Sequence, residues 1–180
     1  MNVYADNAAT TRMSQAAVDA MLPFLRESYG NPSSLYTLGQ KAAESLQASR
    51  ETMAKYLGCD AREITFTSGG SEADNQALLT AATLGARKGK KHIISTAFEH
   101  HAVLHTCAHL EKRGFEVTYV DVDENGVVKL DELKKAIRPD TILISIMFAN
   151  NEIGTIEPVE ELCAVAHRHG VWFHTDAVQA

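Results

Sequence analysis

Residues 141–147 read Thr-Ile-Leu-Ile-Ser-Ile-Met, and this run decides the fold class. A continuous apolar run of this length is typical of a parallel strand that is buried on both faces. Such a strand needs helices on each side of its sheet. Helix and strand patterns alternate on either side of this run. We therefore expect a three-layer α/β/α domain with a mostly parallel sheet.

The flanking patterns place the other elements. Strands are predicted at residues 64–67, 92–95, 116–120 and 171–175. Helices are predicted at residues 14–29, 34–57, 101–113, 131–137 and 158–170, and one more begins at Ser71 with a capping box. Residues 1–13 do not fit the alternation, so we expect them to leave the main domain, which residues 14–180 would form.

Composition excludes several function classes. The 180 residues are 45% hydrophobic and 22% charged, with a formal net charge of −6. This composition is globular, and the negative charge predicts no general attraction to nucleic acid or to an anionic membrane. The apolar run is far shorter than the roughly 20 residues that span a bilayer, and the polar N-terminus predicts no signal peptide.

The cysteines point to the cytoplasm. Cys59, Cys107 and Cys163 form no CxxC pair, which argues against a disulfide framework or a zinc ribbon and fits a reducing compartment. We expect all three to be buried as small hydrophobic residues. The predicted localisation is cytoplasmic.

Small, polar or ionisable residues follow four of the predicted strands. In an open parallel sheet, ligands bind outside the carboxyl ends of the strands. The residues in these positions are Ser68, Gly69, Gly70, Ser71, Glu99, His100, Asn150, Asn151, Glu152, Asp176 and Gln179. Their convergence on one rim predicts a ligand site there.

Gly70 and Ser71 open a helix and form a candidate phosphate cradle. Glycine lets backbone N–H groups approach an anion, and a helix N-terminus favours negative charge. The stretch matches neither the P-loop nor the dinucleotide-binding pattern. The alternative is a tight strand-to-helix turn capped by Ser71.

Asp176 and His100 each have two interpretations. Asp176 can cap a turn, or it can face a cation such as a pyridinium nitrogen, which an ionised carboxylate keeps protonated. His100 can stack on a planar cofactor or move a proton, or it can be a partly exposed residue at a helix entry. His101, His105 and His109 share one helix face, but the HExxH glutamate is absent. We therefore expect a solvated polar stripe and no metal.

The motifs together resemble a known family. They read DNAATT (6–11), GNPSS (30–34), FTSGGSEADN (66–75), EH (99–100), NNEIG (150–154) and HTDAVQ (174–179). In this combination and order they resemble the cysteine desulfurases of the NifS/IscS type. These are pyridoxal 5'-phosphate enzymes of the class V aminotransferase family, with the fold-type I architecture. The GNPSS segment is similar to the NifS/IscS branch rather than to the SufS-like branch.

The resemblance implies a role for each matching residue. Gly70 and Ser71 would hold the cofactor phosphate, and His100 would stack on the ring and assist proton transfer. Asn151 would approach the ring and the substrate, Asp176 would pair with the pyridinium nitrogen, and Gln179 would bond the phenolic oxygen. The implied reaction takes sulfur from L-cysteine and leaves L-alanine and an enzyme-bound persulfide. That sulfur would serve iron–sulfur cluster assembly and tRNA thiolation, through a sulfur-acceptor scaffold protein.

The resemblance also implies that this sequence is an N-terminal portion of a truncated large domain. Family members are about twice as long, so the Schiff-base lysine, the persulfide cysteine and most of the small domain would lie beyond Ala180. Residues 1–13 would join that small domain, and the enzyme would be a homodimer. No lysine here follows a predicted strand end, so we expect the portion to be inactive alone. A non-catalytic module that binds pyridoxal phosphate or a partner, and a related lyase such as a selenocysteine lyase, remain as alternatives.

Overall fold

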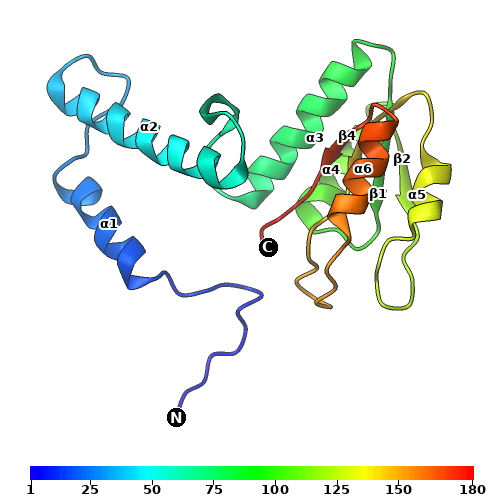
Figure 1. Cartoon of the computed structure of the whole chain (residues 1–180), viewed down its shortest axis with the longest axis horizontal. Helices are drawn as coiled ribbons and strands as arrows, with labels where there is room; N and C mark the ends of the chain where they lie inside the picture. The colour runs from blue at the N-terminus through cyan, green and yellow to red at the C-terminus, as the bar shows by residue number, and fades with distance from the viewer. The chain divides into compact units, whose positions relative to one another are not determined.

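The computed structural model describes all residues from 1 to 180, and the chain divides into two compact units, residues 1–66 and 67–180 (Figure 1). The first unit contains α1 (Gln15–Arg26), α2 (Thr37–Leu57) and the short 3-10 helix η1 (Ala61–Glu63). The second contains α3 (Gly70–Ala86), β1 (His92–Thr96), α4 (His101–Glu111), β2 (Glu116–Val120), α5 (Leu130–Ala136), β3 (Thr141–Ser145), α6 (Val159–Arg168) and β4 (Trp172–His174).

The second unit is built on a four-stranded sheet with the order β2-β1-β3-β4. All three strand pairs are parallel. Because β3 lies between β1 and β4, every residue of its apolar run is buried. The expected α/β fold with a buried parallel strand at its centre is therefore confirmed.

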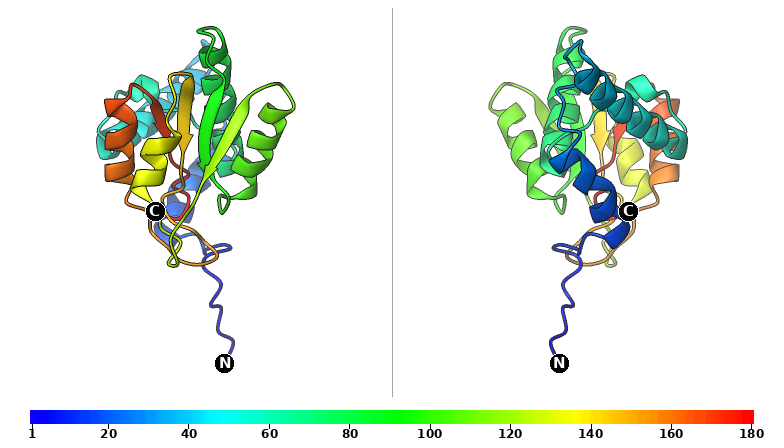
Figure 2. Two further views of the ribbon diagram at one scale, coloured as in Figure 1. Left: turned by 90° about the vertical axis from the view of Figure 1, so that its right-hand side faces the viewer. Right: turned by 90° about the vertical axis from the view of Figure 1, so that its left-hand side faces the viewer.

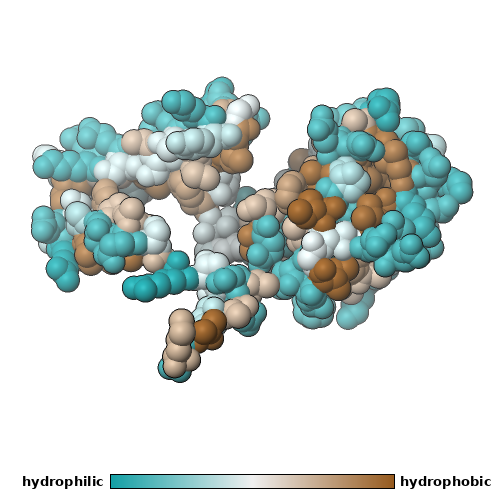
Figure 3. Space-filling view, turned by 60° about the horizontal axis from the view of Figure 1, so that its bottom comes forward, coloured by the Kyte–Doolittle hydropathy of each residue, from teal (hydrophilic) through white to brown (hydrophobic).

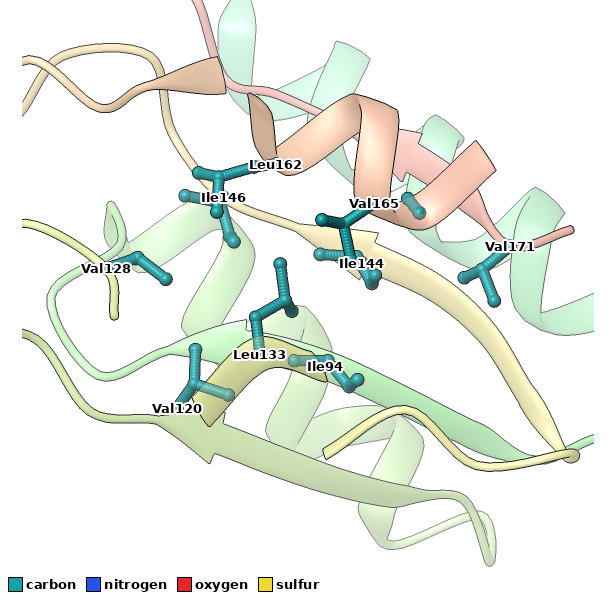
Figure 4. Packing of buried hydrophobic residues seen from close by; sticks show 10 residues of the cluster. Ile94, Val120, Val128, Leu133, Ile144, Ile146, Leu162, Val165 and Val171 are labelled. Atoms are coloured by element: carbon teal, nitrogen blue, oxygen red, sulfur yellow. The ribbon is translucent and has the colours of Figure 1, made fainter. Parts of the chain in front are cut away.

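Helices cover both faces of this sheet (left view of Figure 2). Successive strand residues point to opposite faces, and they supply two separate cores. Ile94 and Ile144 point toward α5 and α6, where they meet Leu133 and Leu162 (Figure 4). The adjacent strand residues, Ile93 and Leu143, point to the other face. There they form a second core with Leu78 of α3 and with Val103 and Leu110 of α4.

Two details of the predicted elements are wrong. Residues 64–67 form no strand, because none of the four strands of the sheet pairs with them. The helix predicted to start at Ser71 begins one residue earlier, with Gly69 as its N-cap residue. Ser71 therefore lies within the first turn and does not cap it.

The first unit has almost no core of its own. Ser14 caps α1, and α2 ends at Gly58, whose φ of 68° is readily adopted by glycine. Within these helices only Gly39 and Ala54 are buried. Many large apolar side chains are exposed, among them Phe24, Leu25, Tyr29, Leu35, Tyr36, Met53, Tyr56 and Leu57. Hydrophobic residues accordingly reach the surface in Figure 3. None of the helices combines the length and the hydrophobicity that a membrane-spanning segment requires.

Candidate active site

The N-terminus of α3 is held by a closed loop of hydrogen bonds. The Glu72 carboxylate accepts from the backbone N–H of Ser68 at 2.7 Å and from the Ser68 hydroxyl at 2.6 Å. These bonds hold the pKa of Glu72 below its usual value. The first N–H groups of a helix have no partner within the helix. The turn that contains Gly70 and Ser71 can therefore present such groups to an anion.

Gly70 lies directly against the segment that follows β4. A Cβ atom at this position would meet Cγ2 of Val178 at 2.6 Å. Such a distance is too short for any side chain, so glycine is what allows the close approach. The contact brings the start of α3 beside the stretch that carries Asp176.

Asp176 is buried, with 8% of its surface exposed. Its Oδ1 accepts from the backbone N–H of Val178 at 3.0 Å, and its carbonyl oxygen accepts from the N–H of Phe148 at 2.8 Å. Asp176 therefore caps a turn, which is the first of the two roles considered for it. Capping occupies one carboxylate oxygen in this turn and is compatible with a cationic partner at the other.

Ser71 and His100 line the same open pocket, whose volume is about 540 Å³. His100 is the N-cap of α4, and its Nδ1 accepts from the N–H of Ala102 at 3.2 Å. Asn75 links the two walls, since it donates to the carbonyl oxygen of Ser71 and accepts from the hydroxyl of Thr106, both at 2.7 Å. The pocket therefore joins the candidate phosphate cradle to the candidate ring-stacking histidine.

Gly70, Asn151, Asp176 and Gln179 are not among the residues that line this pocket. Asn151 lies half-buried in the turn that follows β3, and Gln179 is exposed near the C-terminal residue. The neighbouring Asn150 is the residue that shapes this turn. It donates to the carbonyl oxygen of Phe98 at 2.9 Å and accepts from the N–H groups of Glu152 and Ile153.

Glu99 is a buried rim residue to which the sequence assigned no role. Its Oε1 accepts from the hydroxyl of Thr96 and from the N–H of Met147, both at 2.9 Å, so it joins the ends of β1 and β3. Its Oε2 is buried without a hydrogen-bond partner. Burial raises the pKa of Glu99 to about 7, and the charge of Asp176 adds to the shift. The sequence signal that could have identified Glu99 was an acidic residue three positions after the end of a buried strand.

We expect Glu99 to make the stability of the chain depend on pH. The pKa of Glu99 is higher in the folded state than in the unfolded state, so the folded state holds this proton more tightly. The free energy of unfolding should then fall by about 3 kcal/mol as the pH rises from about 4.5 to about 7. Urea unfolding across this pH range measures the loss.

The matched variants are Glu99→Gln and Glu152→Gln, because Glu152 is exposed. Glu99→Gln should remove most of the fall in stability, and Glu152→Gln should leave it unchanged. An unchanged pH profile in Glu99→Gln would show that another group is responsible.

The remaining histidines and the cysteines form no metal-binding cluster. The rings of His101 and His105 stack with their centroids 5.3 Å apart. Across residues 1–180, no three histidine, cysteine or acidic side chains gather where they could hold a metal ion. Cys107 is buried as expected, and burial raises its pKa to about 12. The same expectation is wrong for Cys59, which is exposed, and for Cys163, which is partly exposed.

The parallel sheet with helices on both faces defines an α/β domain, and a helix N-terminus, a histidine and an aspartate lie at its carboxyl rim. The family model described as aminotransferase class-V matches residues 3–180. The chain belongs to the class V aminotransferase family.

The similar proteins are cysteine desulfurases. The chain is 55% identical to cysteine desulfurase IscS of Methanosarcina thermophila, over 99% of this chain and 44% of that protein. It is 53% identical to cysteine desulfurase IscS of Dictyoglomus turgidum, over 98% of this chain and 45% of the relative. The chain thus spans a little under half the length of these relatives, and the resemblance to the NifS/IscS type is confirmed.

Solved structures agree with this assignment. A NifS-like protein superposes with a TM-score of 0.96 at 46% identity, over 100% of this chain and 50% of that one. A structure of SspA in complex with cysteine superposes with a TM-score of 0.91 at 38% identity, over 97% of this chain and 50% of that one. The fold-type I architecture expected from the sequence is confirmed by these likenesses.

Proposed function

We propose that this chain is the N-terminal portion of a pyridoxal phosphate-dependent cysteine desulfurase. The reaction would take sulfur from L-cysteine, leave L-alanine and hold the sulfur as an enzyme-bound persulfide. The observation that carries the proposal is the close contact of Gly70 with Val178. This contact joins a helix N-terminus suited to a phosphate with the buried carboxylate of Asp176, and the names of the similar proteins support the activity.

The residues present fit pyridoxal phosphate. A Cβ at Gly69 would meet nothing within 4 Å, so the space beside the helix start is free for a phosphate. Ser71 would bind that phosphate with its hydroxyl and its N–H, and His100 would stack on the ring from the start of α4. Asp176 would hold a proton on the ring nitrogen. When bound, the cofactor supplies an electron sink for the substrate carbanion.

Asn151 and Gln179 complete the proposed set of cofactor ligands. Asn151 would orient the ring and substrate from the turn after β3, and Gln179 would bond the phenolic oxygen. Both assignments depend on the family motif, since neither residue lines the pocket formed by Ser71 and His100, and neither has the burial that Asp176 has beside the Gly70–Val178 contact.

We also propose what the remaining part of the protein supplies. Since the relatives are about twice as long, a C-terminal half would bring the Schiff-base lysine, the persulfide cysteine and most of a small domain. Residues 1–13 would join that domain. In the proposed full enzyme two copies form a homodimer, and a scaffold protein accepts the sulfur in the cytoplasm for iron–sulfur cluster assembly and thiolation.

A second candidate is a module that binds pyridoxal phosphate without turnover. The lysine positions favour it for the chain taken alone. Lys90 donates to the carbonyl oxygen of Thr141 at 3.4 Å, at the first residue of β3 and therefore at the amino end of the sheet. The other lysines lie on or beside helices, or in the link between α3 and β1, at positions 41, 55, 88, 91, 112, 129, 134 and 135.

Reduction with borohydride tests the proposal. The chain mixed with pyridoxal phosphate should bind it without forming an aldimine, because a Schiff-base lysine needs a desolvated or cationic setting that lowers its pKa. Peptide mapping by mass spectrometry should find only sparse pyridoxyl labels spread over several lysines. Absorbance titration should find binding that Ser71→Ala and Asp176→Ala each weaken.

The full-length IscS of Methanosarcina thermophila serves as the positive control for labelling. A single stoichiometric adduct on one lysine of residues 1–180 would overturn the expected placement of the catalytic lysine. Absence of any binding to the chain would count against the cofactor itself.

A further inference from the structure

His174 connects three elements beneath the carboxyl rim. Its Nδ1 lies 2.9 Å from the hydroxyl oxygen of Ser145 on β3. Its Nε2 lies 3.5 Å from Oδ1 of Asp74 on α3. The side chains of His174 and Asp74 are only 15% and 6% exposed, and Ser145 is fully buried. The three residues thus form one buried polar chain from α3 through β4 to β3.

This chain of residues cannot act as a serine nucleophile. Ser145 has 0% exposure, so no substrate reaches its hydroxyl. A nucleophilic serine also needs room for a tetrahedral intermediate beside it, and Ser145 lies in the most enclosed strand of the sheet. The arrangement must therefore act on the structure around it rather than on a substrate.

Both ends of the chain lie close to proposed cofactor ligands. Asp74 is three residues after Ser71 in α3, and His174 is two residues before Asp176. The backbone beyond His174 stays paired, since Ile146 donates to the carbonyl oxygen of His174 at 3.1 Å and Phe148 donates to that of Asp176 at 2.8 Å. A displacement of the His174 ring would therefore be transmitted along a short, hydrogen-bonded segment.

We propose that His174, held between Asp74 and Ser145, is a positioning residue that fixes the start of α3 relative to Asp176. This inference rests on the proposed cofactor, because it sets the distance between the two groups that would hold the phosphate and the ring nitrogen. The close approach of Gly70 to Val178 also joins these groups, but it is apolar and non-directional. The His174 side chain adds a polar link, which consists of the hydrogen bond with Ser145 and the 3.5 Å contact between Nε2 and Oδ1 of Asp74. Its loss would leave the buried hydroxyl of Ser145 without this partner.

The experiment compares two ligands on the 180-residue chain. Inorganic phosphate needs only the start of α3, whereas pyridoxal phosphate needs α3 and Asp176 at the correct separation. We expect His174→Ala to weaken pyridoxal phosphate binding by about 10-fold, which is the effect of losing one buried polar link. The same variant should leave phosphate binding within about twofold, because α3 keeps its own first turn. Isothermal titration calorimetry measures both affinities.

His92→Ala is the matched control. His92 is also fully buried and also bonds two side chains, the hydroxyls of Thr141 and Thr118 at 2.8 Å each. It lies at the start of β1, at the far end of the sheet from the rim. The His92→Ala substitution should lower the melting temperature of the chain without changing the ratio of its affinities for pyridoxal phosphate and inorganic phosphate.

Asp74→Asn is the rescue variant, since an amide keeps a polar oxygen in the position that faces Nε2 of His174. It should bind pyridoxal phosphate like the unmodified chain, and Asp74→Ala should lose about 10-fold. Equal effects of His174→Ala and His92→Ala on the ratio would overturn the proposal, and so would a parallel loss of both ligands in His174→Ala. Failure of the unmodified chain to bind pyridoxal phosphate would instead refute the proposed cofactor and, with it, this role.

Discussion

Replacing Asp176 by alanine in the full-length enzyme is expected to abolish desulfurase turnover while weakening pyridoxal phosphate binding much less. The carboxylate is buried at the rim and would keep the ring nitrogen protonated, on which carbanion stabilisation depends. Loss of the partner of a buried cation costs about 2–5 kcal/mol, which corresponds to a loss in rate of roughly 30-fold to several thousand-fold. The phosphate contacts at Gly70 and Ser71 would persist and retain much of the affinity.

Two measurements separate these effects. The rate of L-alanine formation reports turnover, and absorbance titration with pyridoxal phosphate reports affinity. Asp121→Ala is the control, because Asp121 also follows a strand of the sheet but is exposed. Turnover close to that of the unmodified enzyme in Asp176→Ala would remove Asp176 from the site.

Replacing Ile144 by alanine is expected to lower the free energy of unfolding of the second unit by about 2–5 kcal/mol. Ile144 is fully buried in the central strand, and its side chain packs with those of Leu133 and Leu162. The truncation loses apolar burial and leaves a cavity that close-packed neighbours fill only in part.

Urea unfolding followed by circular dichroism measures this cost. Ile153→Ala is the matched control, since Ile153 is 61% exposed, and it should change the stability by less than about 0.5 kcal/mol. A similar small change in both variants would mean that the two cores of the sheet do not limit its stability.

The central strand was predictable because its continuous apolar run is by itself enough to indicate a strand buried on both faces. A run such as residues 141–147 can be buried only between two layers of helices, so it implies the architecture without knowledge of its neighbours. The segment at residues 64–67 has an alternating apolar and polar pattern that also predicts a strand, yet it forms none. A β-strand requires hydrogen bonds to a neighbouring strand, and the local sequence does not reveal whether such a neighbour lies beside it.

The candidate site was predictable where a residue follows its own strand, and less so where it depends on strand order. His100 was placed at the rim by its position after β1, and it does share a pocket with Ser71. Ser71 was placed there by a strand at residues 64–67 that does not form, and it lies near the rim because the start of α3 contacts the segment after β4. The link between Glu99 and Met147 requires β1 to lie beside β3. No local pattern reveals that neighbourhood, and the same is true of the contacts of His174.

The order of the strands in the sheet also bears on how the chain emerges during synthesis. β1 pairs with β2, which is complete at residue 120, and with β3, which is complete only at residue 145. At a translation rate of about 5–20 residues per second, the ribosome needs roughly one to five seconds to add these residues. Throughout that interval the side of β1 that β3 will occupy carries unpaired backbone groups beside Ile93 and Ile94, and a nascent chain on a neighbouring ribosome can pair with it.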